Sequence, residues 1–304
     1  MSCPDCFKGT LRGDVVLTGT EEVIHGIPTY VARPDAGVET RGTIVILPDA
    51  FGWGLQNTRA LADAYAKRLP GVVYVPDFMN GHAAPVSFLS VLEKAEPPSS
   101  APPSVLIRAI KRINTFFTFL SFVPAMATFL FRNRASVTQP RIRGFLAAER
   151  KSAPTTPIGV AGFCWGGLHA VLLTHDVPHN KVTVGGDGVS GGQEYPLIDC
   201  SFTAHPSLLS LPKDIEQVVK PLSVANGSLD DHFGPEKVKI LEEVLDRKNR
   251  EAGLEAGDKK YESVVYPGGK HGFAIRGDRT DPEIREKGEQ SEAQAVEWFK
   301  RWFP

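Results

Sequence analysis

The feature that most constrains the fold of this chain is the pentapeptide GFCWG at residues 162–166. It follows residues 157–161, which have the length and composition of a short buried strand, and it precedes an apolar helical segment over residues 167–173. A sharp strand-to-helix turn of this kind raises its central side chain to where a substrate can reach it. Glycines are needed on both sides because larger side chains would collide where the strand and the helix meet. The pattern predicts that Cys164 is a nucleophile.

Core packing is the alternative role for Cys164, because cysteine is among the most buried residue types. An acid and then a histidine later in the chain favour the nucleophile, since this is the chain order of an α/β-hydrolase triad. Residues 221–227 are predicted to form a buried strand, and Asp230 and Asp231 come directly after it. A carboxylate there lies at the sheet edge where open α/β sheets place their sites. Aspartate also caps helices often, so we expect one of the pair to cap and favour Asp231 for catalysis.

The histidine of the predicted triad is His271, in the glycine-rich loop after the last predicted strand, residues 261–266. A single loop histidine is usually a surface residue, but this one completes the set. An imidazole makes the thiolate accessible from a thiol whose free pKa is about 8.5. Asp231 would hold the productive tautomer of His271 without taking the proton. Cys164 would then attack an acyl carbonyl and give a thioester that water hydrolyses.

The oxyanion of this reaction needs two backbone donors, each worth roughly 3 kcal/mol in known cases. One predicted donor is the N–H of Trp165, the residue after the nucleophile. The other should come from the loop after the strand at residues 42–47, which makes the N–H of Ala50 the first choice and that of Phe51 the second.

Several motifs together resemble the dienelactone hydrolase (carboxymethylenebutenolidase) family, in a fungal-type form, from about residue 22 onward. They are GFCWGG at residues 162–167, DHF at 231–233, HGF at 271–273, PDAFG at 48–52 with Asn57, Arg59, Ala62 and Asp63, and VPDF at 75–78. The resemblance implies one α/β-hydrolase domain with a Cys-His-Asp triad that acts on small activated esters or lactones.

The chain departs from the bacterial members of this family around the predicted substrate pocket. Asp49 stands where they have a glutamate that interacts with the resting cysteine, and Arg276 lies one residue out of step with an arginine that holds the substrate carboxylate. Dienelactone is therefore not predicted as the substrate. The pocket candidates are Asp49, Phe51, Trp53, His82 and Arg276; packing for Trp53 and a surface loop for His82 are equally compatible with the sequence.

Length and composition are those of one large domain. The chain has 304 residues, 42% of them hydrophobic, and a formal net charge of -1. Short predicted strands alternate with helical segments, which favours a mostly parallel sheet with helices on both faces. We predict a single domain over residues 1–304 that binds a small molecule, has no cofactor or metal and, without a basic patch, binds no nucleic acid.

The cysteines favour a reducing compartment. There are four, and one is the predicted nucleophile, so a disulfide framework is not expected. Cys3 and Cys6 form a C-x-x-C without the further ligands that zinc requires, and Cys200 is expected to be a buried core thiol. No apolar segment typical of a secretory signal follows the start of the chain. We expect a cytoplasmic protein.

An apolar insert at about residues 97–140 interrupts the alternation of strands and helices. Its apolar run, residues 115–131, contains Pro124 and would span about 25 Å as a helix, which is short for a bilayer core of roughly 30 Å. A membrane span is therefore not expected. Our first interpretation is a helical cap over the active site, the second is a homodimer contact and the third is contact with a membrane surface. The expected cap residues are Phe116, Phe117, Phe119, Phe122 and Phe129.

The sequence thus predicts a cysteine-dependent hydrolase of small esters, lactones or thioesters. The alternative is a binding protein that keeps the α/β-hydrolase fold but not the reaction. A redox or metal protein that uses Cys3 and Cys6 is a third class, which metal analysis would test.

Overall fold

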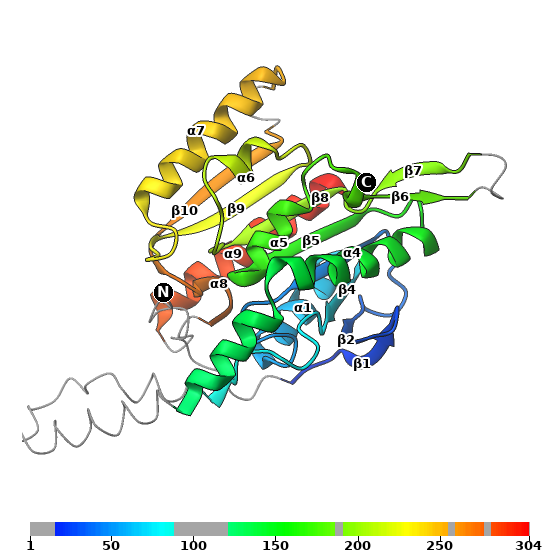
Figure 1. The fold of residues 1–304 in the computed structure, drawn as a ribbon, viewed down its shortest axis with the longest axis horizontal. Helices are drawn as coiled ribbons and strands as arrows, with labels where there is room; N and C mark the ends of the chain where they lie inside the picture. Colours follow the sequence, from blue (N-terminus) through cyan, green and yellow to red (C-terminus); the bar gives the residue numbers. More distant parts are fainter. Residues whose placement is uncertain (1–15, 88–120, 186–190, 255–258, 277–280, 304) are drawn as a thin grey trace, which may run out of the picture.

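The centre of the molecule is an eight-stranded sheet with strand order β1-β2-β4-β3-β5-β8-β9-β10 (Figure 1). The computed structural model describes residues 16–87, 121–185, 191–254, 259–276 and 281–303. The strands of the sheet are β1 (Thr20–Ile24), β2 (Ile27–Ala32), β3 (Gly42–Leu47), β4 (Gly71–Pro76), β5 (Ile158–Phe163), β8 (Cys200–Ala204), β9 (Leu222–Leu229) and β10 (Tyr261–Lys270).

All strands from β4 to β10 in this order pair in parallel. β1 and β2 form an antiparallel pair at one edge, and β2 pairs antiparallel with β4. The predicted mostly parallel α/β-hydrolase sheet is therefore confirmed. Because parallel strands end at the same edge, the loops after β3, β5, β8, β9 and β10 meet there.

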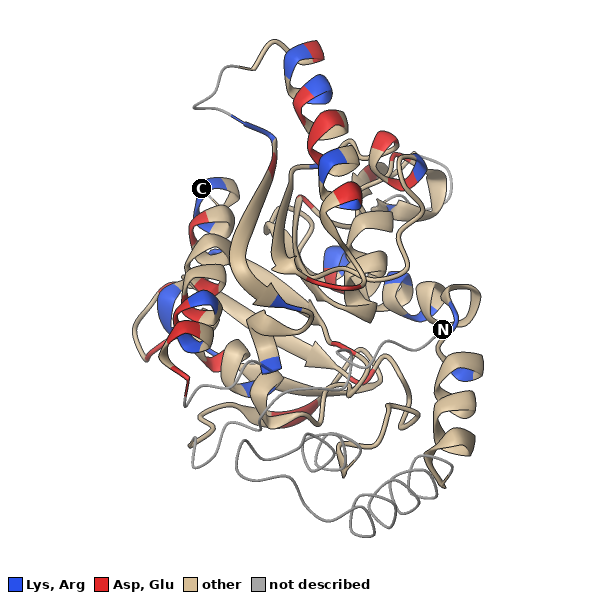
Figure 2. Cartoon of the chain, turned by 90° about the vertical axis from the view of Figure 1, so that its left-hand side faces the viewer, with Lys and Arg blue, Asp and Glu red and all other residues tan. Residues whose placement is uncertain are grey.

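Helices cover both faces of the sheet. On one face lie α1 (Gln56–Arg68), α8 (Phe273–Arg276) and α9 (Pro282–Trp302). On the other lie α4 (Ala135–Ser152), α5 (Trp165–Leu172), α6 (Lys213–Glu216) and α7 (Pro235–Glu251). In Figure 1, α4 and α5 pass in front of the sheet and α9 passes behind it. Figure 2 shows that charged residues gather on α7 and α9, whereas most of the sheet consists of uncharged residues.

Hydrophobic patterning explains this arrangement. Every residue of β3 and of β5 is buried, as expected for central strands covered on both faces. α7 has a single apolar face and buries Val238, Leu241, Val244 and Leu245 along it. Cys200, predicted to be a core thiol, is fully buried in β8. A hairpin of β6 (Lys181–Val184) and β7 (Gln193–Pro196), which the sequence did not predict, projects from the body in Figure 1.

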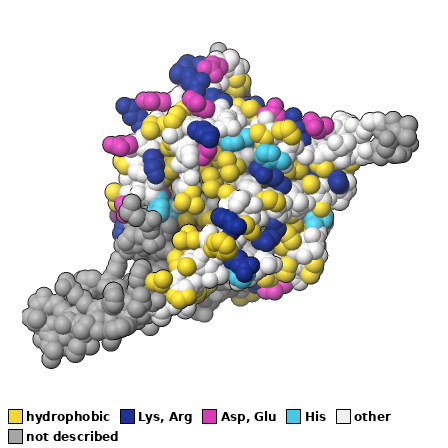
Figure 3. Space-filling view, in the orientation of Figure 1, with side chains coloured by type: hydrophobic (Ala, Val, Ile, Leu, Met, Phe, Trp, Pro, Cys, Tyr) yellow, Lys and Arg dark blue, Asp and Glu magenta, His cyan; other side chains and the backbone are white. Residues whose placement is uncertain are grey.

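The predicted insert is described in part. Residues 121–132 form a helix that is followed by α4, whereas Phe116, Phe117 and Phe119 lie outside the described residues, as do Cys3 and Cys6. Apolar side chains of the 121–132 helix are visible beside the grey atoms in Figure 3. None of the helices among the described residues has the length and apolar character needed to cross a membrane.

Candidate active site

Cys164 occupies the sharp turn between β5 and α5, as the pentapeptide predicts. Its φ is +50°, a strained value for a residue with a side chain. The flanking glycines are required by contact. A Cβ on Gly162 would lie 2.5 Å from the Ala170 Cβ, and one on Gly166 would lie 2.0 Å from the Leu47 carbonyl oxygen. The turn thus closes only with glycine at both positions.

His271 lies at the same sheet edge and is oriented by Asp230. Both carboxylate oxygens of Asp230 lie close to Nδ1 of His271, at 3.0 and 2.9 Å, and both side chains are fully buried. The choice of Asp231 as the orienting acid is therefore wrong, because the Asp231 side chain is exposed. The contact leaves Nε2 of His271 on the side of the nucleophile turn, where a serine hydroxyl lies 3.5 Å from Nε2 and 3.5 Å from Sγ of Cys164.

Asp230 alone fulfils both roles expected of the aspartate pair, capping of the turn and orientation of His271. Oδ1 of Asp230 also accepts the backbone N–H groups of His232 and Phe233, at 2.8 and 3.0 Å. The carboxylate that closes the turn after β9 is therefore the carboxylate that meets His271. The sequence interpretation had divided these roles between adjacent residues, and neighbours in this turn differ in burial, with Asp230 inside and Asp231 outside.

The electrostatics of the site favour an ionised pair. Burial alone would lower the pKa of His271, but the negative charge of Cys164 and the hydrogen bond to Asp230 outweigh it and raise that pKa to about 9. Burial opposes the ionisation of Asp230, yet its hydrogen bond and charge interaction with His271 keep the pKa of this carboxyl below its usual value. These two shifts are the ones that an imidazolium held between a thiolate and a carboxylate would produce.

Asp49, Phe51 and Arg276 form a buried cluster beside this pair. Nε of Arg276 lies 2.7 Å from Oδ2 of Asp49, and both side chains are almost inaccessible to solvent. The guanidinium also lies over the Phe51 ring, 5.4 Å from its centre. Burial, opposed by Arg276 and reinforced by the charge of Cys164, raises the pKa of Asp49 to about 6. Arg276 is therefore bound to a carboxylate of the protein.

The predicted oxyanion donors lie on the two loops that flank the thiol. Ala50 follows β3 and Trp165 begins α5, and both residues are buried. Within the described part of the chain, neither backbone N–H has a hydrogen-bond partner. The N–H of Phe51, the second choice, donates to Oδ1 of Asp49 at 3.0 Å. Ala50 and Trp165 therefore remain the preferred pair.

The 121–132 helix packs against Trp165. The Phe129 ring is buried 6.4 Å from the Trp165 ring, and Phe122 also contacts this part of the core. Nε1 of Trp165 donates to the carbonyl of Asn133 at 3.1 Å. The described part of the insert thus packs against the residue that follows Cys164, and its role as a cap stays a prediction.

Two pocket candidates lie farther out. Trp53 is partly buried, and the Arg59 guanidinium lies over it, with Cζ 4.8 Å from the centre of the Trp53 ring. His82 follows β4, and its carbonyl accepts from the Asn133 side chain at 2.8 Å. His82 thereby ties the loop after β4 to the helix beside Trp165, with its backbone rather than its ring.

Sequence reasoning missed Ser207, whose hydroxyl lies 3.5 Å from Sγ of Cys164 and 3.5 Å from Nε2 of His271. It also missed His205, a fully buried histidine whose ring centre is 5.1 Å from that of His271. Their position just after β8, at the carboxyl edge of the sheet, was the available signal.

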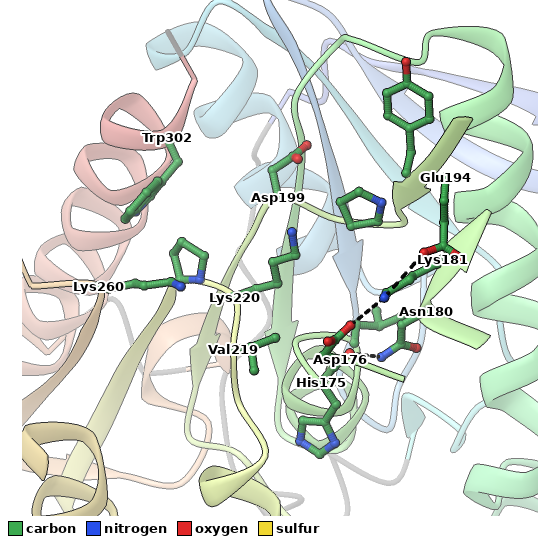
Figure 4. Close-up of a pocket in the computed structure, with 14 residues that line it drawn as sticks. His175, Asp176, Asn180, Lys181, Glu194, Asp199, Val219, Lys220, Lys260 and Trp302 are labelled. Carbon is green, nitrogen blue, oxygen red and sulfur yellow. Dashed lines mark hydrogen bonds and ion pairs between the residues drawn. The ribbon is translucent and has the colours of Figure 1, made fainter. Parts of the chain in front are cut away.

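A hollow of about 680 Å³ lies at the opposite edge, where β8, β9 and β10 begin. Figure 4 shows Lys220 and Lys260 reaching into it from the strand ends and Lys181 paired with Asp176 and Glu194. The hollow does not include the nucleophile. Among the residues described, no group of three or more His, Cys, Asp or Glu side chains is arranged to hold a metal ion.

A parallel sheet with a nucleophile turn, followed along the chain by an acid and a histidine at one edge, defines an α/β-hydrolase. Residues 27–303 match the dienelactone hydrolase family, and the chain belongs to that family.

Curated relatives match the chain over nearly its whole length. It is 26% identical over 297 residues to "Hydrolase tropI" of Talaromyces stipitatus, with 98% of this chain and 95% of the relative covered. It is 23% identical to a "Carboxymethylenebutenolidase homolog" of Xenopus tropicalis, with 93% and 91% covered.

A solved structure of a putative dienelactone hydrolase from Klebsiella pneumoniae has the same fold. Its TM-score is 0.56 at 16% identity, and the match covers 94% of this chain and 98% of that one.

Proposed function

We propose that this protein is a cysteine-dependent hydrolase of small esters, lactones or thioesters, with a Cys164–His271–Asp230 triad and an acyl-enzyme intermediate. The observation that carries the proposal is a buried imidazole that contacts Asp230 at 2.9 Å through Nδ1 and turns Nε2 toward a hydroxyl that lies 3.5 Å from both Nε2 and Sγ of Cys164. The general activity, that of a hydrolase, follows from membership of the chain in the dienelactone hydrolase family.

The reaction would begin with attack of the Cys164 thiolate on the substrate carbonyl. The oxyanion accepts from the N–H groups of Ala50 and Trp165, and His271, protonated at Nε2, gives its proton to the departing alkoxide. Asp230 stabilises the imidazolium and fixes its tautomer. In the second half, neutral His271 takes a proton from water, which attacks the thioester carbonyl and releases the acid and the thiolate.

The charges around the site favour a substrate without a carboxylate. Arg276, the candidate for binding a substrate carboxylate, is paired with Asp49 inside the protein. A substrate carboxylate would have to compete with that buried pair, and breaking one costs about 3 to 5 kcal/mol. The ring of Phe129 lies 6.4 Å from that of Trp165, the residue after the nucleophile, and these rings support an apolar acyl or leaving group under a cap that includes residues 121–132.

The test compares Cys164→Ala with Cys200→Ala, which removes a thiol from the core of β8. Both are assayed with aryl esters, lactones and thioesters of neutral and carboxylate-bearing acids. We expect Cys164→Ala to lose turnover of the whole panel and Cys200→Ala to keep it. A slowly hydrolysed aryl ester should add its acyl mass to Cys164 of the wild type. Full esterase activity in Cys164→Ala would refute the triad and favour a catalytically silent fold or another nucleophile.

The cytoplasmic location and the homodimer remain predictions. The first rests on cysteine usage, which includes two free cysteines among the described residues, Cys164 and Cys200. The second rests on the apolar insert and is tested by light scattering.

A further inference from the structure

The loop after β8 brings a serine between the two reacting side chains. Ser207 is buried, and its hydroxyl lies 3.5 Å from Sγ of Cys164 and 3.5 Å from Nε2 of His271. Sulfur has a larger radius than oxygen, so the first distance is an ordinary hydrogen-bond length. The second is long, as catalytic hydrogen bonds often are before substrate binds. A hydroxyl can accept one hydrogen bond and donate another at the same time.

We propose that Ser207 is a positioning residue that holds the ionised Cys164–His271 pair: its hydroxyl accepts from Nε2–H and donates to the thiolate. This inference rests on the proposed function. No proton is transferred in the resting state, because the serine only bridges the imidazolium and the thiolate. The serine therefore favours the charged pair over the neutral one and sets the distance between its members.

The backbone fixes Ser207 in this place. Its N–H donates to the carbonyl of Cys164 at 3.0 Å, and the N–H of Cys164 donates to the carbonyl of Ala204 at 3.3 Å. The loop and the nucleophile turn are thus hydrogen-bonded in both directions. A Cβ on Gly167 would lie 2.8 Å from the Cα of Pro206, so glycine at the start of α5 is what lets the loop approach so closely.

His205 anchors the other side of the loop. Its N–H donates to the carbonyl of Ala225 in β9 at 2.8 Å, and its φ of +40° is a strained value held by the surrounding structure. Its ring is fully buried against Phe163, Phe273 and His271. Burial lowers the pKa of His205 to about 3, so the ring stays neutral and adds no second positive charge beside His271.

The electrostatic consequence can be measured. A hydrogen bond to a charged group is stronger than one to a neutral group. Loss of the Ser207 hydroxyl therefore destabilises the thiolate more than the thiol, and the pKa of Cys164 should rise. We expect Ser207→Ala to move the midpoint of the alkylation-rate profile upward by about one pH unit. At a pH below both midpoints the rate should fall about tenfold, and at a pH above both it should match the wild type.

The experiment follows iodoacetamide alkylation of Cys164 across pH by mass spectrometry, in parallel with kcat/KM for an aryl ester. Ser201→Ala is the matched control, because it removes another buried hydroxyl from β8, the strand that leads into this loop, and that hydroxyl donates to the carbonyl of Ala170. Ser207→Thr keeps a hydroxyl and should restore the wild-type midpoint. Circular dichroism establishes that each variant is folded.

The outcomes separate this inference from the function on which it rests. A raised midpoint in Ser207→Ala, with Ser201→Ala and Ser207→Thr unchanged, supports the bridge. An unchanged midpoint in folded Ser207→Ala overturns it, while loss of turnover in Cys164→Ala would still support the triad. If Cys164→Ala keeps its activity, the proposed function and the inference both fail. If Ser207→Ala does not fold, an upward shift in Ser207→Cys supports the bridge and an unchanged midpoint overturns it.

Discussion

Replacing Asp230 by asparagine tests the corrected triad, with Asp231→Asn as the matched control one residue away. The pKa of His271 is raised from 6.5 to about 9, a difference of roughly 3 kcal/mol in favour of the imidazolium. The charge of the thiolate and the contact with the Asp230 carboxylate provide this stabilisation of the imidazolium, and burial opposes it. If Asp230 supplies half, its loss costs a little under about 2 kcal/mol, or roughly twentyfold in rate.

The tautomer adds to this loss. An asparagine amide that donates to Nδ1 would leave the proton on the wrong ring nitrogen, and the same change in a serine protease costs about 10⁴ in kcat. We therefore expect kcat/KM for an aryl ester to fall at least about twentyfold in Asp230→Asn and to stay close to wild type in Asp231→Asn. Thermal unfolding checks that both variants are folded. An Asp231→Asn loss larger than that of folded Asp230→Asn would refute the assignment.

Three further changes test other parts of the argument. Gly166→Ala places a Cβ 2.0 Å from a backbone carbonyl oxygen of β3, so we expect loss of activity and an unfolding free energy lower by about 3 kcal/mol in denaturant unfolding. The control is Gly144→Ala on α4, where a Cβ meets open space and should leave stability unchanged or raise it. Phe129→Ala should lower kcat/KM about tenfold for esters of large apolar acids but not for acetate esters, and Phe131→Ala, with 65% of its side chain exposed, should change neither; equal losses for both acyl sizes would argue against a pocket wall. The pKa of Asp49 is raised from 3.8 to about 6, so its ionisation costs the folded state about 3 kcal/mol as pH rises through that window. Asp49→Asn should abolish this part of the pH dependence of the unfolding free energy, and an unchanged slope between those pH values would contradict the assignment.

The parts of the fold that the sequence predicted are those set by local constraints. The turn at Cys164 needs glycine on both sides for steric reasons, so its position could be read directly from residues 162–166. The central strands are buried on both faces and appear as continuous apolar runs. The α7 helix has one apolar face and a charged remainder, which is the pattern of a surface helix that packs on a sheet.

The predictions about site residues that were wrong or incomplete depend on the direction in which a side chain points. Asp230 and Asp231 have the same chemistry and the same place in the chain, and only the backbone of the turn after β9 decides which one enters the site. Arg276 was expected to face substrate, but α8 turns it inward to Asp49. Ser207 belongs to no motif and becomes important only because β8 lies beside β5 in the sheet.

In the proposed mechanism the ionised groups of this buried site nearly balance, and this balance favours a thiolate there. Cys164, Asp230 and Asp49 carry negative charge, and His271 and Arg276 carry positive charge; the pKa of Asp49, raised to about 6, leaves its charge easily removed. Without Arg276, the charge of Asp49, whose pKa is raised by burial and then by the charge of Cys164, would repel the thiolate. The arginine therefore acts on the nucleophile indirectly, by cancelling a neighbour's charge. A substrate carboxylate would add a further negative charge to a site whose cations are already paired, which is why neutral esters fit this member of the family better.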